Sequence, residues 1–308
     1  MHNERARMPP KKLPEPPAEY LSRYDAMCDR AAAQVIASYS SSFTLATRLL
    51  TGGTKRDIRN LYAMVRIADE IVDGTAIAAD VAPAAALDAY EAAVLAAPDV
   101  RFHTDPVLHA YGGSARRCGF SSEHVQAFFA SMRRDALSQH TYSDQEFAEY
   151  VYGSAEVIGL MCVCAFVAND PACVRLSDTQ REKLDAGARA LGSALQKINF
   201  LRDYGEDRNV LGRTYFPQTV GTKLDDAAKA TLITDIRAEL DLAQRAIPLL
   251  PGSAQRGVAA AEALFRELTV LLEHTPADQL AGTRISLPTI RKLAVTARAV
   301  ARKGSYGS

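Results

Sequence analysis

Long stretches without proline constrain this 308-residue chain more than any other feature of its sequence. Proline is absent from residues 18–82, 107–170, 172–216 and 218–247. Because proline breaks the hydrogen-bond ladder of a helix interior, gaps of this length favour long helices. No segment alternates convincingly between apolar and polar residues, and no Asn-Gly or Asp-Gly pair joins two strand-like segments. The sequence therefore predicts an all-α fold with ten or more helices.

Capping residues predict where three of these helices begin. A Ser or Thr followed three residues later by an acidic residue or Gln can satisfy the free backbone N–H groups of a first turn. The pairs are Thr54 with Asp57, Ser143 with Glu146, and Ser177 with Gln180. Gly74 is expected to end the helix that Thr54 begins, because glycine favours the position just after a helix.

The composition fits one folded domain preceded by a short tail. Five of the 14 prolines lie in residues 1–17, which we expect to be a disordered tail, whereas residues 18–304 are expected to form a single domain. The five cysteines form no C-x-x-C pair, which favours reduced thiols and a cytoplasmic location. The longest apolar run, residues 157–168, is too short to span a bilayer. Lys+Arg and Asp+Glu both number 36, so no bulk attraction to nucleic acid arises, and no nucleic-acid partner is expected.

Two segments place carboxylates among apolar residues. The first is LYAMVRIADEIVDG, residues 61–74, and the second is ALQKINFLRDYGEDRNVLGRTYFP, residues 194–217. Residues four or three apart share one face of a helix. The first stripe so defined is Tyr62, Arg66, Asp69 and Asp73, and the second is Gln196, Asn199, Asp203 and Asp207, flanked by Arg202.

A pair of acids four residues apart is most often only a solvated helix face, and Asp25 with Asp29 is such a pair in this chain. Both chosen stripes differ because apolar residues and an arginine accompany them. Buried carboxylates are costly unless they are paired or bind a metal, and oxygen ligands suit Mg²⁺. Two acid stripes that face each other across a helical bundle could hold several Mg²⁺ ions. Such ions would hold a diphosphate, to which Arg66 and Arg202 would add charge-assisted hydrogen bonds.

The chain resembles the squalene/phytoene synthase family over nearly all of residues 25–302. The resemblance lies in SSSF (residues 40–43), in YAMVRIADEIVDG, in YVYGSAEVIG (residues 150–159), and in LQKINFLRDYGED followed by GRTYFP. Two long motifs in this order are specific, whereas a lone D-x-x-x-D is not. The resemblance implies the isoprenoid-synthase fold, a single-domain helical bundle around a central cavity.

The resemblance also implies roles for individual residues. Mg²⁺ ions, or Mn²⁺ in their place, would bridge the substrate diphosphates to Asp69, Asp73, Asn199, Asp203 and Asp207. The diphosphates would contact or lie near Ser40, Ser42, Arg66, Gln196, Arg202 and Tyr215, and Tyr62 would be a further substrate-binding residue. Phe43 and Tyr150 would face the reacting allylic carbons. The chain departs from many relatives at Ala155-Glu156, where Ala-Gly is frequent, and at Phe265, where a tyrosine is frequent.

The implied activity is Mg²⁺-dependent head-to-head condensation of two prenyl diphosphates through a cyclopropyl intermediate. The DEIVDG form of the first motif is more similar to phytoene synthases, which favours two C20 geranylgeranyl diphosphates, release of diphosphate and no nicotinamide cofactor. The close alternative is condensation of two C15 farnesyl diphosphates to squalene or dehydrosqualene. A terpene cyclase and a non-enzymatic relative that assists assembly of respiratory complexes are further alternatives. The cyclase metal motif usually has Ser or Thr and then Glu where this chain has Asp203 and Asp207, and intact acid motifs argue against the assembly factor.

Three other features have a structural interpretation, and two of them also have a functional one. The small residues Ala155, Gly159, Gly192 and Ala194 either make room for two long chains or only allow close helix packing. The RRD segment, residues 133–135, is interpreted as a solvated or salt-bridged helix face, with contact to the pocket as the alternative. The Cys162 and Cys164 pair is interpreted as core packing.

The C-terminal segment, residues 284–304, is basic and contains no acidic residue. Ile290, Leu293, Ala297 and Val300 fall on one helical stripe, and Arg298 and Arg302 stack on another. One interpretation is peripheral contact with an anionic membrane surface. The other is a terminal helix that packs on the bundle and exposes its basic face to water.

Overall fold

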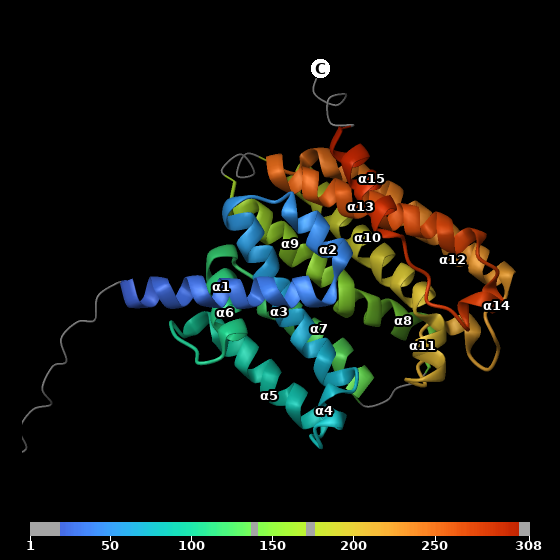
Figure 1. Ribbon diagram of the computed structural model, residues 1–308, viewed down its shortest axis with the longest axis horizontal. Helices are drawn as coiled ribbons and strands as arrows, with labels where there is room; N and C mark the ends of the chain where they lie inside the picture. Colours follow the sequence, from blue (N-terminus) through green and yellow to red (C-terminus); the bar gives the residue numbers. More distant parts are fainter. Residues whose placement is uncertain (1–18, 137–140, 171–175, 302–308) are drawn as a thin grey trace, which may run out of the picture.

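The computed structural model describes residues 19–136, 141–170 and 176–301, and every regular element in these ranges is helical (Figure 1). The all-α prediction is therefore confirmed, whereas the predicted tail, residues 1–17, lies outside the described residues. The first half contains α1 (Glu19–Tyr39), α2 (Ser41–Arg48), α3 (Gly52–Val72), α4 (Thr75–Ala78), α5 (Pro83–Ala96), η1 (Ala97–Asp99), α6 (Pro106–Cys118), α7 (Ser122–Ala136) and α8 (Asp144–Val151). The second half contains η2 (Tyr152–Glu156), α9 (Val157–Ala168), α10 (Asp178–Arg202), α11 (Tyr204–Asn209), η4 (Pro217–Thr219), α12 (Asp226–Ala246), η5 (Ile247–Leu249), α13 (Gly252–His274), α14 (Ala277–Leu280) and α15 (Thr289–Ala301).

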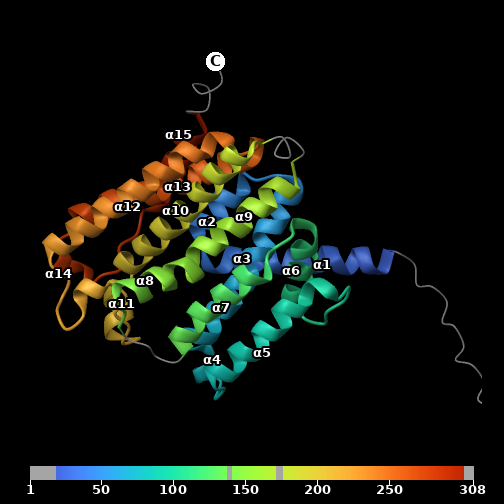
Figure 2. The ribbon, with the colours of Figure 1, turned by 180° about the vertical axis from the view of Figure 1, so that it is seen from behind.

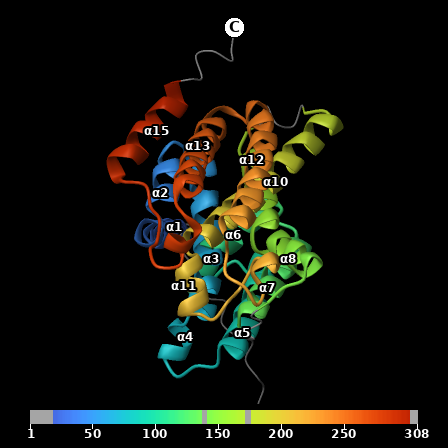
Figure 3. The same ribbon diagram turned by 90° about the vertical axis from the view of Figure 1, so that its right-hand side faces the viewer.

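The helices bury two large apolar clusters, one on each side of the bundle. One cluster lies between α3, α5, α6, α7 and α9 and contains Leu61, Met64, Phe128 and Phe129, each at most 1% exposed. The other joins α8 and α10 to α12 and α13 and contains Ile198, Leu201 and Leu240. The view in Figure 3 separates α12, α13 and α15 at one end from α4 and α5 at the other. Helices α3 and α10, which carry the two acid stripes, therefore each have one face fixed by a packed core.

Two of the three predicted capping pairs are confirmed, and one is wrong. Ser143 with Glu146 and Ser177 with Gln180 both form capping boxes. Helix α3 begins at Gly52 instead of near Thr54, so the Thr54–Asp57 pair lies inside the helix. The Asp57 carboxylate is fully buried and accepts hydrogen bonds from other helices and loops, so it is not available to cap a helix.

Gly74 follows α3 as predicted, with a φ of 119°. A residue with a side chain rarely adopts this left-handed conformation, whereas glycine adopts it without steric cost. Gly74 therefore ends α3 directly after Asp73, and Asp73 occupies the C-cap position. The last carboxylate of the first stripe is thus placed at a helix terminus.

Helices α8 and α9 are joined by the π-helical segment η2 into one continuous rod, residues 144–168, beside α10 (Figure 2). This rod is long enough and apolar enough to cross a membrane by length and composition, and 44% of its apolar 18-residue window is buried inside the protein. Its η2 and α9 parts pack against α7 and α10. These contacts are those of the core helix of a bundle. A π-helical turn adds one residue to the helical repeat and is frequent at functional sites.

Two glycines set the close approach between α10 and this rod. A Cβ atom on Gly192 would lie 2.5 Å from the carbonyl oxygen of Ala155, and a Cβ on Gly159 would lie 2.4 Å from that of Ala188. Both distances are too short for any side chain. Both glycines also line the central cavity, so close packing and space for a ligand are achieved by the same residues. Ala194 is fully buried in the core instead.

Gly192→Ala is expected to destabilise the protein even though alanine is the better helix former. Propensity alone favours alanine by about 1 kcal/mol, but the overlap with the Ala155 carbonyl forces α10 and η2 apart, at a cost of about 1–3 kcal/mol. Gly113→Ala is the matched control, because the nearest atoms to a Cβ at this helical position are the movable ends of the Arg117 and Arg116 side chains. Chemical denaturation of both variants checks this. Equal stability changes in the two variants would contradict the close-contact explanation.

Candidate active site

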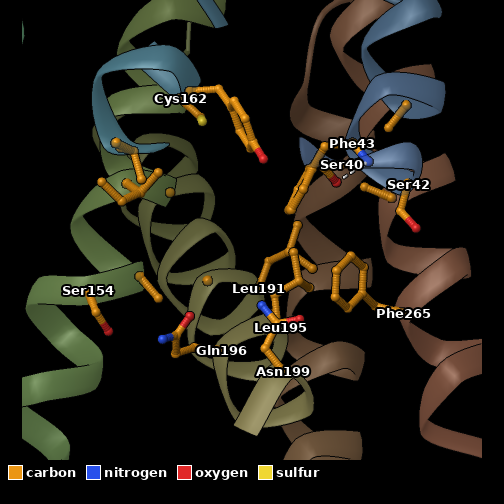
Figure 4. Close-up of a pocket in the computed structure, with 18 of the residues that line it drawn as sticks. Ser40, Ser42, Phe43, Ser154, Cys162, Leu191, Leu195, Gln196, Asn199 and Phe265 are labelled. Atoms are coloured by element: carbon orange, nitrogen blue, oxygen red, sulfur yellow. Dashed lines mark hydrogen bonds between the residues drawn. The ribbon is translucent and has the colours of Figure 1, made fainter. Parts of the chain in front are cut away.

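A long cavity of about 830 Å³ runs through the bundle. Its walls come from α2, α3, η2, α9, α10 and α13, and the close-up in Figure 4 places Ser40 and Phe43 across from Ser154. On α10 its lining extends from Leu184 to Arg202, which at 1.5 Å per residue spans roughly 27 Å. This volume lies in the upper part of the usual range for ligand pockets. The cavity is therefore suited to long ligands.

Every residue that the sequence proposed for the site lines this cavity. They are Ser40, Ser42, Phe43, Tyr62, Arg66, Asp69, Asp73, Tyr150, Gln196, Asn199, Arg202, Asp203, Asp207 and Tyr215. The acid stripes belong to α3 and to α10–α11, which are separate in sequence and meet at the same cavity. The structure thus brings the predicted residues together. Their predicted roles in binding metal and substrate stay predictions.

The first stripe lies along the C-terminal half of α3. The Arg66 guanidinium approaches Asp69 at 3.6 Å and Asp73 at 3.7 Å, and it also pairs with Glu70. The guanidinium also lies over the aromatic ring of Tyr39, with its carbon atom 4.4 Å from the ring centroid. The Nε atom of Arg66 is buried and has no hydrogen-bond partner among the described residues. Arg66 therefore balances the stripe and retains one unused donor.

The second stripe continues across a helix break. Helix α10 ends at Arg202, and Asp203 joins it to α11 with φ −100° and ψ 10°. The backbone nevertheless keeps the four-residue register, because the N–H of Asp203 donates to the Asn199 carbonyl at 2.9 Å and that of Asp207 donates to Asp203 at 2.9 Å. The break thus preserves the predicted spacing although the stripe does not lie on one uninterrupted helix.

Asp135 is the residue whose sequence interpretation was wrong. The RRD segment was interpreted as a solvated or salt-bridged face, and Arg133 and Arg134 do form ion pairs near the surface. Asp135, however, is 6% exposed, lines the cavity and accepts hydrogen bonds from the hydroxyls of Tyr150 at 2.6 Å and Tyr215 at 3.2 Å. A signal was present in the sequence, because Asp135 continues the buried stripe that Phe128 and Met132 form on α7.

Arg213 is a second residue that the sequence analysis did not single out, although it belongs to the GRTYFP segment. It is 7% exposed, donates to Asp73 at 3.1 Å and to the Val72 carbonyl at 2.8 Å, and lies 3.8 Å from Asp135. Burial alone would lower its pKa, but the electrostatic effects of Tyr215, Asp135 and Asp73 raise it further above the ordinary value. Spacing along the chain contains no signal for this contact, because Val72 and Arg213 are 141 residues apart.

Three of the carboxyl groups hold protons more tightly than an ordinary aspartate. Burial and the neighbouring Asp73 raise the pKa of Asp69 to about 8, against the opposing effect of Arg66. Burial and Asp203 raise the pKa of Asp207 to about 7, and burial raises that of Asp135 to about 6 despite Arg213. The protein alone therefore does not supply enough positive charge to keep Asp69 ionised at neutral pH, and Asp207 is only partly ionised. A bound cation would supply it.

The donor set fits Mg²⁺ that is completed by substrate. The Oδ1 atom of Asn199 is buried, lines the cavity and lacks a hydrogen-bond partner among the described residues, as expected for an oxygen that is free to bind an ion. In the described ranges, no three His, Cys, Asp or Glu side chains converge closely enough to enclose an ion by themselves. Mg²⁺ typically keeps several waters and takes one or two carboxylates together with substrate phosphates, so an open arrangement suits it.

Two further cations at the cavity come from the segment before α15 and from α15 itself. Arg284 pairs with Asp203 at 2.9 Å, and Lys292 donates to the Ser41 hydroxyl at 2.8 Å. Arg202 pairs with Asp203 through its Nε at 2.9 Å. The charged lining therefore consists of five carboxyl groups, Asp69, Asp73, Asp135, Asp203 and Asp207, and five cations, Arg66, Arg202, Arg213, Arg284 and Lys292. Two diphosphates carry more negative charge than these five cations can offset, so bound metal ions would assist the binding of both.

Aromatic rings form the wall next to the charged end. The Tyr215 ring stacks on Phe200 with centroids 3.9 Å apart, and Tyr150 lies 5.3 Å from Tyr215. Phe43 lies 5.7 Å from Phe265 and 5.9 Å from Tyr62 on the opposite side. The faces of such rings carry partial negative charge and attract cations. Phe265, at the position where relatives often have tyrosine, contributes a ring and no hydroxyl group.

Cys162 and Cys164 differ in their surroundings. Cys162 packs against apolar residues of two core clusters and also lines the cavity, and burial raises the pKa of its thiol to about 12. Cys164 does not line the cavity. The interpretation as core packing is therefore incomplete for Cys162, which presents an uncharged sulfur to the apolar part of the pocket.

Metal-free protein is expected to lose stability as the pH rises from about 4 to about 8. Asp69 and Asp207 have raised pKa values when folded, so the folded state binds more protons than the unfolded state, and raising the pH favours unfolding. Asp69→Asn should remove part of this slope and raise the free energy of unfolding at pH 8 by at least about 1 kcal/mol. Thermal unfolding in EDTA across this pH range measures it.

The control for this measurement is Asp235→Asn, which changes an exposed aspartate on α12. It should leave the pH slope unchanged. Adding Mg²⁺ should flatten the slope of the unaltered protein, because ions that bind the ionised carboxylates stabilise the folded state. A slope that is equal in the Asp69→Asn variant and the unaltered protein would contradict the assignment of repulsion to this carboxylate.

Comparison with known proteins places this geometry in a family. The family model described as Squalene/phytoene synthase matches residues 36–291. A 15-cis-phytoene synthase from a Paracoccus species is 29% identical over 236 residues, covering 73% of this chain and 72% of the relative. A phytoene synthase from Mycobacterium tuberculosis is 27% identical over 288 residues, covering 86% of this chain and 88% of the relative.

A dehydrosqualene synthase solved in complex with a ligand has the same fold, with a TM-score of 0.75 and 21% identity over 94% of this chain and 99% of that chain. The expected isoprenoid-synthase-type bundle is therefore confirmed. The residues matched by the family model include both acid stripes and the segment between them. The chain belongs to the squalene/phytoene synthase family.

Proposed function

We propose that this protein condenses two geranylgeranyl diphosphates head to head, through a cyclopropyl diphosphate, to give phytoene. The observation that supports this most is the division of one cavity into a charged end and a long apolar remainder. Both acid stripes and the five cations line the charged end, whereas Cys162, Val163, Phe166, Leu184, Ile247 and Leu250 are among the apolar lining residues. A ligand with a diphosphate head and a long hydrocarbon tail matches both parts.

Binding of the diphosphate heads is assigned to the cations and to the unused polar atoms. The free Arg66 Nε can donate to a phosphate oxygen, and the guanidinium groups of Arg202 and Arg284 can exchange Asp203 for phosphate. The carboxylates and the Asn199 oxygen would hold Mg²⁺ ions. When bound, these ions would neutralise the negative charge that develops on the departing diphosphate.

The allylic cation left behind needs surroundings without water and without a strong nucleophile. Tyr150 is 2% exposed, and its hydroxyl is held by Asp135, so its ring and not its oxygen is presented along the wall. Phe43 and Phe265 offer further ring faces across the cavity. The double bond of the second prenyl chain would then attack the cation and form the cyclopropane ring with loss of a proton. Departure of the second diphosphate, rearrangement and loss of another proton would give the hydrocarbon.

The choice of C20 over C15 substrates is supported by the relatives and by the first motif. The Paracoccus and Mycobacterium relatives are both named phytoene synthases. Squalene synthases tend to have an additional acid in the first motif, which reads DEIVDG here. The LQKINFLRD segment is compatible with both reactions, so the rival product is squalene or dehydrosqualene from two farnesyl diphosphates.

The test of this proposal is product analysis after incubation with C15 and C20 diphosphates in parallel, with Mg²⁺ and without NADPH. We expect a C40 hydrocarbon from the C20 substrate and release of diphosphate. A C30 product made only from the C15 substrate would favour the rival. A cyclopropyl diphosphate that accumulates until NADPH is added would show squalene-type chemistry. Release of diphosphate without coupling would indicate a cyclase, and no release would indicate a non-catalytic relative.

Asp203→Asn is expected to lower turnover by at least roughly 100-fold while the protein stays folded, because the carboxylate that Arg202 and Arg284 share is lost from the charged end. Asp235→Asn is the control for removal of one exposed carboxylate that does not line the cavity. Initial rates with the C20 substrate and circular dichroism of both variants provide the comparison. Near-normal rates in the Asp203→Asn variant would remove this carboxylate from the proposed mechanism.

A further inference from the structure

Helix α15 exposes an apolar stripe and packs its other face on the bundle. Val295 and Thr296 are buried, and the helix packs against α13 and α2. The outward residues are Ile290, Leu293, Ala294, Ala297 and Ala301. Ile290 is 83% exposed and Leu293 is 53% exposed. An outward stripe of this kind is the opposite of the arrangement expected for a terminal helix whose apolar face packs and whose basic face meets water.

Basic residues flank the stripe on one side. At 100° per residue, Arg291 and Arg298 lie next to the Ile290–Ala294 edge, and both are exposed. Arg291 pairs with Glu267 of α13, whereas Arg298 has no ion pair among those found in the described ranges. No acidic residue occurs in residues 284–301. Arg302 and Lys303, which the sequence analysis counted with this segment, lie outside the described residues.

The same helix borders the cavity. Lys292, on the inner side of α15, lines the pocket and bonds to Ser41, and Arg284, Ser286 and Leu287 line it from the segment that leads into α15. Figures 1 and 3 both place α15 on the outside of α13, at the end of the molecule opposite α4. The first half of α15 therefore has the exposed Ile290 and Leu293 on one side and the pocket-lining Lys292 on the other.

We propose that α15 docks the protein on an anionic lipid surface, with Ile290 and Leu293 inserted among the lipids and Arg298 at the headgroups. A helix with an apolar face and basic residues beside it lies in the plane of a membrane interface. One short stripe of this kind buries far less area than a stable protein dimer needs, and its basic flank would repel a second copy. The inference rests on the proposed function in one respect, because that function requires substrates and a product that partition into lipid.

Docking through α15 would place the cavity next to the membrane that holds the substrates and the product. Substrate tails would reach the cavity from the lipid side, next to α15, while the diphosphate heads would meet Arg284 and Lys292 at the charged end. The hydrocarbon product would leave toward the same surface. The membrane would thus supply the substrates and take up the product, and it would have no chemical role in the reaction.

The experiment is co-sedimentation with vesicles of neutral phosphatidylcholine, and of phosphatidylcholine with about one third phosphatidylglycerol, at low and high salt. We expect binding to the anionic vesicles at low salt. Ile290→Ser combined with Leu293→Ser should lower the partition coefficient at least roughly tenfold, because two inserted side chains are lost. Arg298→Gln should lower it about fivefold, the factor that corresponds to about 1 kcal/mol for one basic residue near the surface.

The matched controls are Ile77→Ser and Arg101→Gln. Ile77 is 64% exposed on α4, at the opposite end of the molecule, and Arg101 is exposed on the loop before α6. Both should bind vesicles like the unaltered protein. Failure of the unaltered protein to bind anionic vesicles, or equal loss of binding in the controls and the α15 variants, would overturn the inference.

Two further measurements separate this inference from the proposed reaction and from a protein interface. Turnover of the α15 variants in detergent, where substrate is delivered without a membrane, should equal that of the unaltered protein. Vesicle binding without any C40 product would leave the docking inference standing and refute the reaction. A dimer in light scattering that the Ile290→Ser and Leu293→Ser changes convert to monomer, with vesicle binding unchanged, would show that α15 is instead a protein interface.

Discussion

The contacts of the Arg213 guanidinium hold the charged end of the cavity together. It joins the C-terminus of α3, through Asp73 and the Val72 carbonyl, to Asp135 of α7. A cation at the end of a helix also complements the partial negative charge of the last carbonyl groups. Burying several carboxylates is possible only with such a partner, because an unpaired buried charge costs several kcal/mol. Arg213 thereby allows three helices to bring acids to one cavity without separating.

This pairing leaves the carboxylates of the proposed metal site only partly neutralised. Arg213 and Arg66 each serve several acids, and the pKa of Asp69 is still about 8. A fully compensated cluster would be more stable and would have no affinity for a metal ion. Repulsion that remains in the empty site is free energy that metal and diphosphate can recover on binding. The instability expected of the metal-free protein and the affinity expected for Mg²⁺ therefore have the same origin.

The two stripes could be predicted from sequence because the helix period fixes which residues share a face. Tyr62, Arg66 and Asp69 lie on one continuous helix, so their spacing was sufficient. The second stripe crosses the break at Asp203, and the prediction still succeeded because the four-residue backbone bonds continue through it. Arg213 could not be predicted in this way, because its partners are brought to it by the packing of α3 and α7. The apolar stripe of α15 was visible in the sequence, but only tertiary packing decides that it faces outward.

Asp57 shows why residue type and burial alone do not identify the site. Like Asp69 it is an aspartate on α3. Burial opposes its ionisation, but hydrogen bonds from Arg56, Arg117, Asn169 and Ser114 lower its pKa to about 2. Every direction around that carboxylate is occupied by a donor, so it fixes α3 to α6 and to the end of α9 and has no capacity left for a ligand. Asn199 differs because its buried Oδ1 has no hydrogen-bond partner among the described residues, and Asp69 differs because the Arg66 guanidinium approaches it only to 3.6 Å. In this bundle an incompletely hydrogen-bonded polar group at a cavity, and not an acidic residue as such, distinguishes a binding site from a structural ion pair.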